Sequence, residues 1–509
     1  MLLRMSAALV AGVVLALAYE PFVLPIVVPF SVAAFVLCVR GLTPLKALIP
    51  GLLFGVGFMY VLIFWMRVVG PDAWVALATL EALFYAVLGA VTAVVTRLRW
   101  WPLWTAAAWV GCEVFRSSGT TGWMPWGRVS YAMVDTPVAQ LFPWVGGNGT
   151  SFVLALLGSS LAWAALYGRQ HPRGATALVL GVSLLAGAGA LVPWHSRADG
   201  TLTVAAVQGN VPGDGSDILL DYRQVTRNHV DLTVRLADDV AAGRAPRPDF
   251  VVWPENSTAV DPFTDEETNG GIWEASDAIG VPILVGAVAS APDDDQVLNQ
   301  GIVWNPGTGG GDRYTKRHPV AMGEYIPYRN GALTKMVGRL ALVPRDMLAG
   351  TRSQPLDIAG IPVADAICFD VAYDDGLYEQ VRNGAQLVVV QTSNATFIHT
   401  KQIEQQFAIT RLRALETGRY VVVAATNGIS GVIAPDGTVV SQAAPRTQKL
   451  LLDEVDLHEE VPPGVILGPW VGRGAVLVAL LAAALALVPY RRGRETSADS
   501  APDNIEVLT

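Results

Sequence analysis

Long apolar runs fill the first 194 residues of this chain, and short polar loops that carry glycine or proline separate them. One further apolar run lies near the C-terminal end. A helix needs about 20 predominantly apolar residues to cross a bilayer. The pattern therefore predicts about eight transmembrane helices, near residues 5–19, 22–39, 47–66, 72–96, 101–115, 150–168, 175–193 and 472–490.

The middle of the chain has a different pattern, in which short apolar runs alternate with amphipathic ones and with polar turns. A helical period over Asp221–Ala241 and Lys401–Glu416 predicts two helices, and Asp436-Gly437 predicts a hairpin turn. Apolar, β-prone runs predict strands at Thr201–Val207, Phe250–Trp253, Pro282–Ala287, Gly301–Trp304, Val363–Cys368, Leu387–Gln391, Tyr420–Ala425 and Gly431–Ala434. We expect one α/β domain with a buried sheet.

These patterns divide the chain into a membrane domain over residues 1–194 with seven transmembrane helices, an α/β domain over 195–470, a final transmembrane helix over 471–491, and a disordered tail over 492–509. Composition agrees, because 52% hydrophobic and 16% charged residues are unusual for a soluble protein. The net charge is −9, and no Lys/Arg stripe is interleaved with aromatic residues. These two features exclude nucleic-acid binding.

Basic residues are unequally distributed between the two sets of alternating loops. The side that holds Arg4 carries ten of them, whereas the short loops on the other side carry only Arg67, Arg116 and Arg128. Since Lys and Arg are enriched in cytoplasmic loops, both termini are predicted to be cytoplasmic and the α/β domain extracytoplasmic.

Two segments allow alternative interpretations. Residues 1–18 could be a cleaved signal peptide, because Ala16-Leu17-Ala18 resembles a cleavage site, but another apolar run follows at once. Residues 117–149 contain too many Gly and Pro residues for one spanning helix. Their Trp123, Trp126 and Trp144 suit the lipid headgroup level, so this segment is either an interfacial loop or a gate that admits lipid.

Candidate chemistry centres on Cys368, because Cys38 and Cys112 fall within predicted membrane helices. A lone thiol outside the membrane is either buried and inert or a nucleophile, and a helix predicted to start near Asp374 would lower its pKa. A nucleophile needs a base and a positive group. Glu255 and Lys316 are the candidates, although each alone could be an ordinary surface residue.

The residues around these three form recognisable runs. They are Trp253-Pro254-Glu255, then Tyr314-Thr315-Lys316-Arg317-His318 with Gly323–Pro327 shortly after, and Ile367-Cys368-Phe369-Asp370. Together they resemble the carbon-nitrogen hydrolase (nitrilase) superfamily with its Glu-Lys-Cys triad. The apolar runs around that domain resemble the apolipoprotein N-acyltransferase family, and the likeness covers nearly the whole chain.

The resemblance implies an αββα sandwich outside a bacterial cytoplasmic membrane, and an acyl transfer without metal or organic cofactor. Cys368 would take an acyl chain from a phospholipid as a thioester and pass it to the N-terminal amine of a diacylglyceryl-modified apolipoprotein. Glu255 would be the base, Lys316 would stabilise the oxyanion, and Glu324 would be a second essential carboxylate. We expect a monomer.

The chain departs from the family pattern after the nucleophile. Many relatives have Tyr-Glu where this chain has Phe369-Asp370, and many have Asp-Ala-Trp-Phe-Gly after the Ser-Asn that corresponds to Ser393-Asn394. A tryptophan that is common in relatives is absent from Val211–Leu220. We expect Phe369, Asp370 and Asn394 to support the site, and these changes to affect lipid and acceptor contacts more than the triad.

Two other functions are compatible with parts of the sequence. A membrane-anchored amidase or nitrilase would use the same triad with water, but one helix would suffice as its anchor. A catalytically silent membrane scaffold would not need Glu255, Lys316 and Cys368 together.

Overall fold

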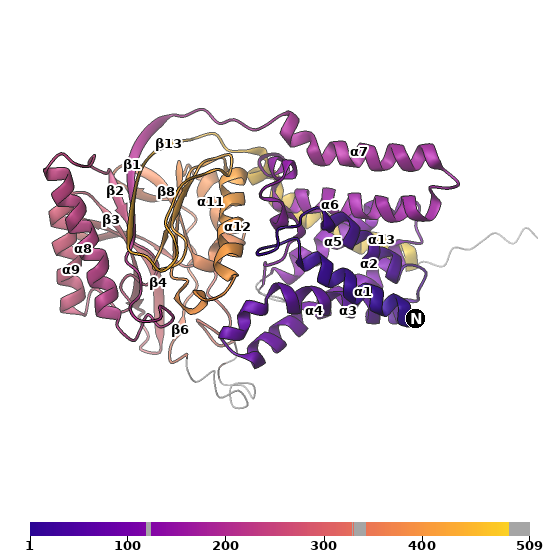
Figure 1. Cartoon of the computed structure of the whole chain (residues 1–509), viewed down its shortest axis with the longest axis horizontal. Helices are drawn as coiled ribbons and strands as arrows, with labels where there is room; N and C mark the ends of the chain where they lie inside the picture. The colour runs from indigo at the N-terminus through magenta and orange to yellow at the C-terminus, as the bar shows by residue number, and fades with distance from the viewer. Residues whose placement is uncertain (119–123, 328, 330–342, 488–509) are drawn as a thin grey trace, which may run out of the picture.

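The computed structural model describes residues 1–118, 124–327, 329 and 343–487. They form a helical region and an α/β region that lie side by side along the longest axis of the molecule (Figure 1). Trp123 and the tail 492–509 lie outside the described residues.

The helical region is a bundle of apolar helices. Within the described residues, five helices are long and apolar enough to cross a membrane, namely Pro44–Leu62, Pro71–Val95, Pro137–Tyr167, Pro172–Leu191 and Pro463–Leu487. Its α-helices are α1 (Leu2–Ala16), α2 (Val27–Val39), α3 (Pro44–Leu62), α4 (Pro71–Val95), α5 (Trp101–Arg116), α6 (Phe142–Tyr167), α7 (Pro172–Leu191) and α13 (Pro463–Leu487). Short 3-10 helices are η1 (Phe64–Val68), η2 (Val129–Met133) and η3 (Pro137–Leu141).

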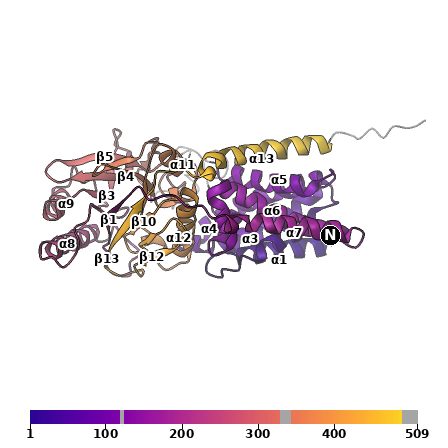
Figure 2. The same ribbon diagram turned by 90° about the horizontal axis from the view of Figure 1, so that it is seen from above.

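The last helix, α13, begins earlier than the apolar run near 472–490 suggests, because Pro463 starts it where the chain leaves the α/β region. It packs along α5 and α6 on the outside of the bundle (Figure 2). Arg116 and Arg128, which the sequence pattern placed in loops, are both buried, and Arg116 pairs with Glu81 of α4 at 3.0 Å.

The strands of the α/β region form two sheets. In the described residues the first has the order β13-β1-β2-β3-β4-β5, with β6 beside β4, and the second has the order β12-β11-β10-β9-β8-β7. The first contains β1 (Gly200–Gln208), β2 (Phe250–Val252), β3 (Ile283–Ser290), β4 (Gln296–Asn305), β5 (Gly309–Thr315), β6 (Asp346–Met347) and β13 (Lys449–Leu457). The second contains β7 (Leu356–Ile358), β8 (Ile361–Ile367), β9 (Leu387–Thr392), β10 (Val421–Ala425), β11 (Gly431–Ile433) and β12 (Val439–Gln442).

Helices cover the outer face of each sheet, which gives the expected αββα layering. On the side away from the bundle are α8 (Tyr222–Ala241) and α9 (Glu266–Ile279), and on the side facing it are α11 (Asp375–Arg382) and α12 (Gln402–Thr417) (Figures 1 and 2). The alternation along β8 explains this. Val363 and Ile367 pack between the sheets, whereas Ala364 and Ala366 face the helices and the bundle.

The predicted strands and both predicted helices are confirmed, with ends shifted by a few residues. The hairpin turn is confirmed as well, since Asp436-Gly437 joins the antiparallel strands β11 and β12. The prediction missed α9, β6, β7 and β13, and also β5, whose Gly309-Gly310-Gly311 start gives no β-prone signal.

One carboxyl group, that of Asp365, lies in the core between the two sheets. Neither of its oxygens, nor Oε1 of Gln391, has a hydrogen-bond partner among the described residues. Gly301 on the facing strand leaves room for them, because a Cβ there would lie 2.2 Å from Asp365 Oδ2 and 2.5 Å from Gln391 Oε1. Burial raises the pKa of Asp365 well above its usual range.

Asp365→Asn is therefore expected to stabilise the protein at neutral pH. The pKa of Asp365 is higher in the folded protein than in the unfolded chain, where the carboxyl loses its proton near about pH 4. The free energy of unfolding therefore falls as pH rises above about 4. The midpoint of thermal unfolding should rise at pH 8 by at least about 2 °C, roughly the shift that 1 kcal/mol produces in a domain of this size. The gain should shrink as pH falls toward 5.

The matched control is Asp277→Asn, on the exposed face of α9. It should leave the midpoint unchanged at both pH values. An Asp365→Asn midpoint equal to or below wild type at pH 8 would show that the buried carboxyl is not a cost to the fold.

Candidate active site

Three loops at strand ends bring the candidate residues together. Glu255 follows β2, Lys316 follows β5 directly, and Cys368 follows β8 directly. Glu255 and Lys316 are buried, with 3% and 0% of their surface exposed, and Cys368 is half-buried. The alternatives of a solvated loop acid and a surface lysine are therefore wrong for this fold.

The Glu255 carboxylate is held by three donors. Its Oε1 accepts from the Lys316 ammonium at 3.1 Å and from the Asn299 side-chain amide at 2.8 Å. Its Oε2 accepts from the backbone N–H of Ser393 at 2.9 Å. Hydrogen bonds to an ionised group are short and strong, so these three fix the orientation of the carboxylate.

The Lys316 ammonium lies between two carboxylates. In addition to Glu255, it donates to Glu324 Oε1 at 2.6 Å, and Glu324 Oε2 accepts from the Val320 N–H at 2.8 Å. Burial lowers the pKa of an ammonium group, but Glu255 and Glu324 outweigh it and hold the pKa of Lys316 well above its usual range. Lys316 is therefore a permanent positive charge in the site.

The backbone around Lys316 is fixed as well. Its N–H donates to the Asn299 carbonyl at 2.8 Å, and its carbonyl accepts from the Gly350 N–H at 2.8 Å. A Cβ at Gly350 would lie 2.1 Å from the Thr315 carbonyl oxygen, so this approach requires glycine. Asn299 thus holds both the base candidate and the lysine.

Cys368 has a backbone conformation that side-chain-bearing residues rarely adopt, with φ of 52°. It begins the 3-10 turn η5 (Cys368–Ala372). The Thr392 hydroxyl at the end of β9 hydrogen-bonds to the thiol. Glu255, Lys316 and Glu324 all lie close enough to shift the thiol pKa.

The expected lowering of the thiol pKa by a helix start is wrong. Burial raises the pKa of Cys368 to about 12, the Glu255 charge adds to the rise, and Lys316 and the Thr392 hydrogen bond offset only part of it. Helix α11 begins at Asp375, beyond η5, and the field of a helix end falls off within its first turn. The resting thiol is therefore protonated, so a nucleophilic role for Cys368 would require a base that takes its proton.

Asp370 joins the turn that carries Cys368 to the loop that carries Lys316. Its carboxylate accepts from the N–H groups of Arg317 at 3.2 Å and His318 at 2.7 Å, and from the Tyr314 hydroxyl at 2.9 Å. It also contacts the His318 ring at 3.1 Å. The expectation that this position affects lipid contacts more than the triad is wrong for Asp370, because every one of these contacts is internal.

His318 is held between two carboxylates. Its ring contacts Asp370 and, through Nε2, Asp375 at 3.3 Å, and it stacks on Tyr373 with ring centroids 3.8 Å apart. Burial lowers the pKa of an imidazole, but these carboxylates raise the pKa of His318 to about 9. The protonated ring therefore reinforces the orientation of Asp370.

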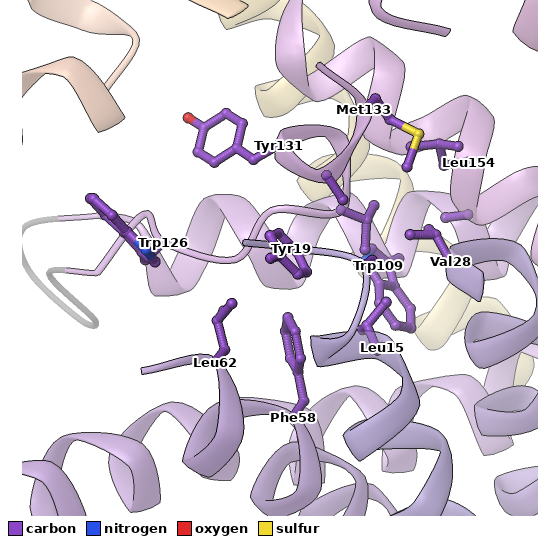
Figure 3. Close-up of a cluster of buried hydrophobic side chains, with 14 of the residues drawn as sticks. Leu15, Tyr19, Val28, Phe58, Leu62, Trp109, Trp126, Tyr131, Met133 and Leu154 are labelled. Atoms are coloured by element: carbon purple, nitrogen blue, oxygen red, sulfur yellow. The ribbon is translucent and has the colours of Figure 1, made fainter. Parts of the chain in front are cut away.

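Phe369 points to the helical region instead. Its ring stacks on Trp126 with centroids 6.0 Å apart, and Trp126 also meets Trp65 at 5.8 Å. Trp126 is buried and donates its indole N–H to Gln405 Oε1 at 2.7 Å, so a half-wetted position at headgroup level is wrong for it. Figure 3 shows Trp126 and Tyr131 in one buried cluster of the helical region.

Asn394 follows the strand end that carries Thr392. It is buried, has a φ of 58°, and donates to Gln406 Oε1 on α12 at 3.1 Å. Gln406 in turn donates to the Thr392 hydroxyl at 3.1 Å. Asn394 therefore helps to orient Thr392, the hydrogen-bond partner of the thiol, through Gln406.

Sequence reasoning missed Asn299, Thr392 and the Ser393 N–H as parts of the site. The signal for Asn299 was the polar pair Asn299-Gln300 inside an apolar strand. Thr392 and Ser393 lie in the run that ends in the candidate Asn394, but nothing in that run shows that the Thr392 hydroxyl and the Ser393 backbone N–H contact the site. Among the described residues, no group of three or more His, Cys, Asp or Glu side chains could hold a metal ion.

Two family models match the chain in succession. Residues 11–160 match the apolipoprotein N-acyltransferase N-terminal domain, and residues 203–461 match carbon-nitrogen hydrolase. The second match contains every candidate site residue.

Curated relatives extend the similarity over most of the chain. The apolipoprotein N-acyltransferase of Mycolicibacterium smegmatis is 38% identical over 87% of this chain and 78% of its own. The enzyme of the same name from Methylococcus capsulatus is 29% identical, covering 92% of this chain and 93% of its own. That of Pseudomonas aeruginosa strain UCBPP-PA14 is 30% identical over 94% and 95%.

Proposed function

Because this chain belongs to the apolipoprotein N-acyltransferase family, we propose that it adds an acyl chain to the N-terminal amine of lipoproteins through a thioester on Cys368. One observation carries the mechanism. A buried lysine, paired with two carboxylates, lies beside a protonated thiol in a domain that is joined to apolar helices. That arrangement suits acyl transfer from a lipid.

In the first step, Glu255 takes the thiol proton while the Cys368 sulfur attacks the ester carbonyl of a membrane phospholipid. The C–O bond of the tetrahedral intermediate breaks, and the departing lysophospholipid oxygen takes the proton from Glu255. A thioester remains on Cys368. Concerted proton removal is needed, because the pKa of the buried thiol is raised to about 12.

In the second step, the amine of a diacylglyceryl-modified N-terminal cysteine attacks the thioester. The C–S bond breaks, and the proton that the amine loses passes through Glu255 to the departing sulfur. The products are an amide and the free thiol, so the enzyme returns to its starting state without any cofactor.

Lys316 supplies the positive charge in both steps. Its ammonium lies beside Glu255 and near the thiol, where an oxyanion forms on the attacked carbonyl. Glu324, on the other side of Lys316, keeps the ammonium in place, and 18% of its side chain is exposed. Burial raises the pKa of Glu324, and Lys316 offsets part of the rise.

We place the catalytic domain on the extracytoplasmic side of a bacterial cytoplasmic membrane. The distribution of basic residues over the loops supports this orientation. The amidase alternative is not favoured, because the chain matches the N-acyltransferase N-terminal model as well as the hydrolase model.

The function is tested by amide formation in vesicles of bacterial phospholipids with a diacylglyceryl peptide as acceptor. Mass spectrometry should find one added acyl chain on the peptide's N-terminus with the wild-type protein. Glu255→Gln and Lys316→Met should each lower the rate by about 10²-fold or more, because they remove the base and the oxyanion charge.

The matched controls are Glu266→Gln and Lys401→Met, both on the exposed surface of the α/β region. These should retain the wild-type rate. A wild-type protein that never acylates the peptide would disprove the function, and a near-normal rate in either site variant would remove that residue from its role.

A further inference from the structure

A buried group of charged and phenolic side chains connects the nucleophile turn η5 to the helical region. We call it the junction cluster, and its members come from the 117–149 segment, α11 with its N-cap, and α12. All are buried except Asp374, whose side chain is 14% exposed. The members are Arg128, Tyr131, Asp374, Tyr378, Arg413 and Glu416.

Two members hold the carbonyl groups at the end of the nucleophile turn. The Arg413 Nε donates to the Val371 carbonyl at 2.7 Å. The Tyr131 hydroxyl, from the helical region, donates to the Ala372 carbonyl at 2.8 Å. These carbonyls lie three and four residues after Cys368, so both bonds act on the turn that the thiol begins.

The same two members are bonded to each other. Arg413 donates to the Tyr131 hydroxyl at 2.9 Å and to Asp374 Oδ1 at 3.0 Å. Arg128 donates to both oxygens of Asp374, at 2.8 and 2.7 Å. The helical region therefore reaches the turn directly through the Tyr131 hydroxyl and indirectly through the ion pair of Arg128 with Asp374.

Glu416 connects the cluster to a kink in α6. Its carboxylate accepts from Arg413, from the Tyr378 hydroxyl and from the Gly147 N–H, the last at 2.7 Å. Gly147 follows the non-helical Gly146, so its N–H lies at the start of the longer helical segment of α6, after the kink. A carboxylate is favourable at such a position.

The charges of the junction cluster are balanced, but the cost of removing them from water indicates that the cluster does more than stabilise the fold. Two arginines face two carboxylates, so the cluster is neutral. Removing four charges from water is nevertheless expensive, and apolar residues of similar volume often stabilise a protein as well or better. A precise geometry is what such a network supplies.

The turn needs such support, because Cys368 has its unusual φ of 52°. Conformations of this kind persist only where the surroundings hold them. At the start of the turn, Asp370 accepts a hydrogen bond from the N–H of Ile367 at 3.3 Å. At its end, the junction cluster holds the carbonyls of Val371 and Ala372.

We propose that Tyr131, Arg128 and Arg413 are positioning residues, through which the helical region sets the attack geometry of the Cys368 thiol. This inference rests on the proposed role of Cys368 as the nucleophile. The helical region then contributes to the chemical step itself, in addition to anchoring the domain.

The test uses the full chain in phospholipid vesicles and measures single-turnover thioester formation on Cys368. Tyr131→Phe keeps the ring and removes one hydroxyl, and Arg413→Lys keeps the charge and removes the bond to Val371. Each should lower the rate at saturating phospholipid by about 10- to 10²-fold, the scale of loss from a misplacement of about 1 Å. The half-saturating phospholipid concentration should stay within about twofold of wild type, because positioning acts on the chemical step.

Arg411→Gln is the matched control. Arg411 lies two residues before Arg413 on α12. It also pairs with a residue of the helical region, Asp135, at 2.7 Å, but this ion pair is at the surface. Its loss should change the rate by less than about twofold. The double variant Tyr131→Phe/Arg413→Lys should lose less than the product of the single losses, because both residues act on one turn.

Three outcomes overturn the inference. Tyr131→Phe and Arg413→Lys could react at the wild-type rate, lose no more than Arg411→Gln, or change only the half-saturating concentration. If instead the wild-type protein forms no thioester on Cys368, the proposed function fails and not the positioning role alone.

Discussion

Cys368→Ala is expected to abolish thioester formation and acyl transfer together, while the protein still folds and inserts into the membrane. In the proposed mechanism the Cys368 sulfur carries the acyl chain covalently in both steps, so its loss should leave no group to form the intermediate. The Cys368 side chain is half-buried and small, its hydrogen bond and charge interactions are with groups of the site, and it packs against the core between the sheets, where alanine keeps the Cβ. Loss of a catalytic nucleophile removes more than loss of any positioning residue.

The measurement is incubation with a labelled phospholipid without acceptor, followed by hydroxylamine, which cleaves thioesters. The wild type should carry a hydroxylamine-sensitive label and Cys368→Ala none. Cys38→Ala and Cys112→Ala, in α2 and α5, should label like the wild type and show that the effect is specific to one thiol. A folded Cys368→Ala protein that still acylates the peptide would refute the mechanism.

The sequence was sufficient for elements with a strong local pattern. The apolar run Leu387–Gln391 became β9, and the amphipathic period over Lys401–Glu416 became α12. Both elements are built from side chains whose burial follows from their own spacing. The motifs around Glu255 and Cys368 were visible for a similar reason, since each lies at the end of a predicted strand, whereas Lys316 was visible from its own motif because β5 was not predicted.

Local patterns could not predict what distant segments do to one another. The thiol pKa depends on burial and on Glu255, which is 113 positions away in the sequence numbering, so the helix start near Asp374 was a misleading guide. Trp126 is a residue type that is common at membrane interfaces, but here it is buried, with its indole N–H bonded to Gln405 and its ring stacked on Phe369. Tyr131 carried no signal at all, because its partner is a backbone carbonyl 241 residues away.

Asp370 shows how a conservative change can be misjudged. Its one-methylene difference from the Glu of many relatives suggested altered substrate contacts. In the fold its carboxylate accepts hydrogen bonds from two backbone N–H groups that follow Lys316. Its short side chain therefore fits the distance between the loop that carries Lys316 and the turn that carries Cys368. The strands that precede these two segments, β5 and β8, belong to different sheets. The role of Asp370 is therefore visible only in the folded protein, where the ends of the two strands lie close together.

The fate of the thioester separates acyl transfer from hydrolysis. A thioester reacts with either water or an amine, so the outcome depends on which one reaches it in attacking geometry. Phe369, the residue after Cys368, stacks on the buried Trp126 of the helical region, so apolar surface lies next to the turn that the thiol begins. An acyl chain on Cys368 should therefore meet few productive waters.

The most direct measurement is the decay of the isolated Cys368 acyl-enzyme with and without a diacylglyceryl peptide. The acyl-enzyme should be long-lived alone and discharge rapidly when the peptide has a free N-terminal amine, giving the amide. The N-acetylated peptide should not discharge it, because its nitrogen is no longer nucleophilic. Decay to free fatty acid at one rate with or without the amine would contradict N-acyl transfer and identify the protein as a hydrolase.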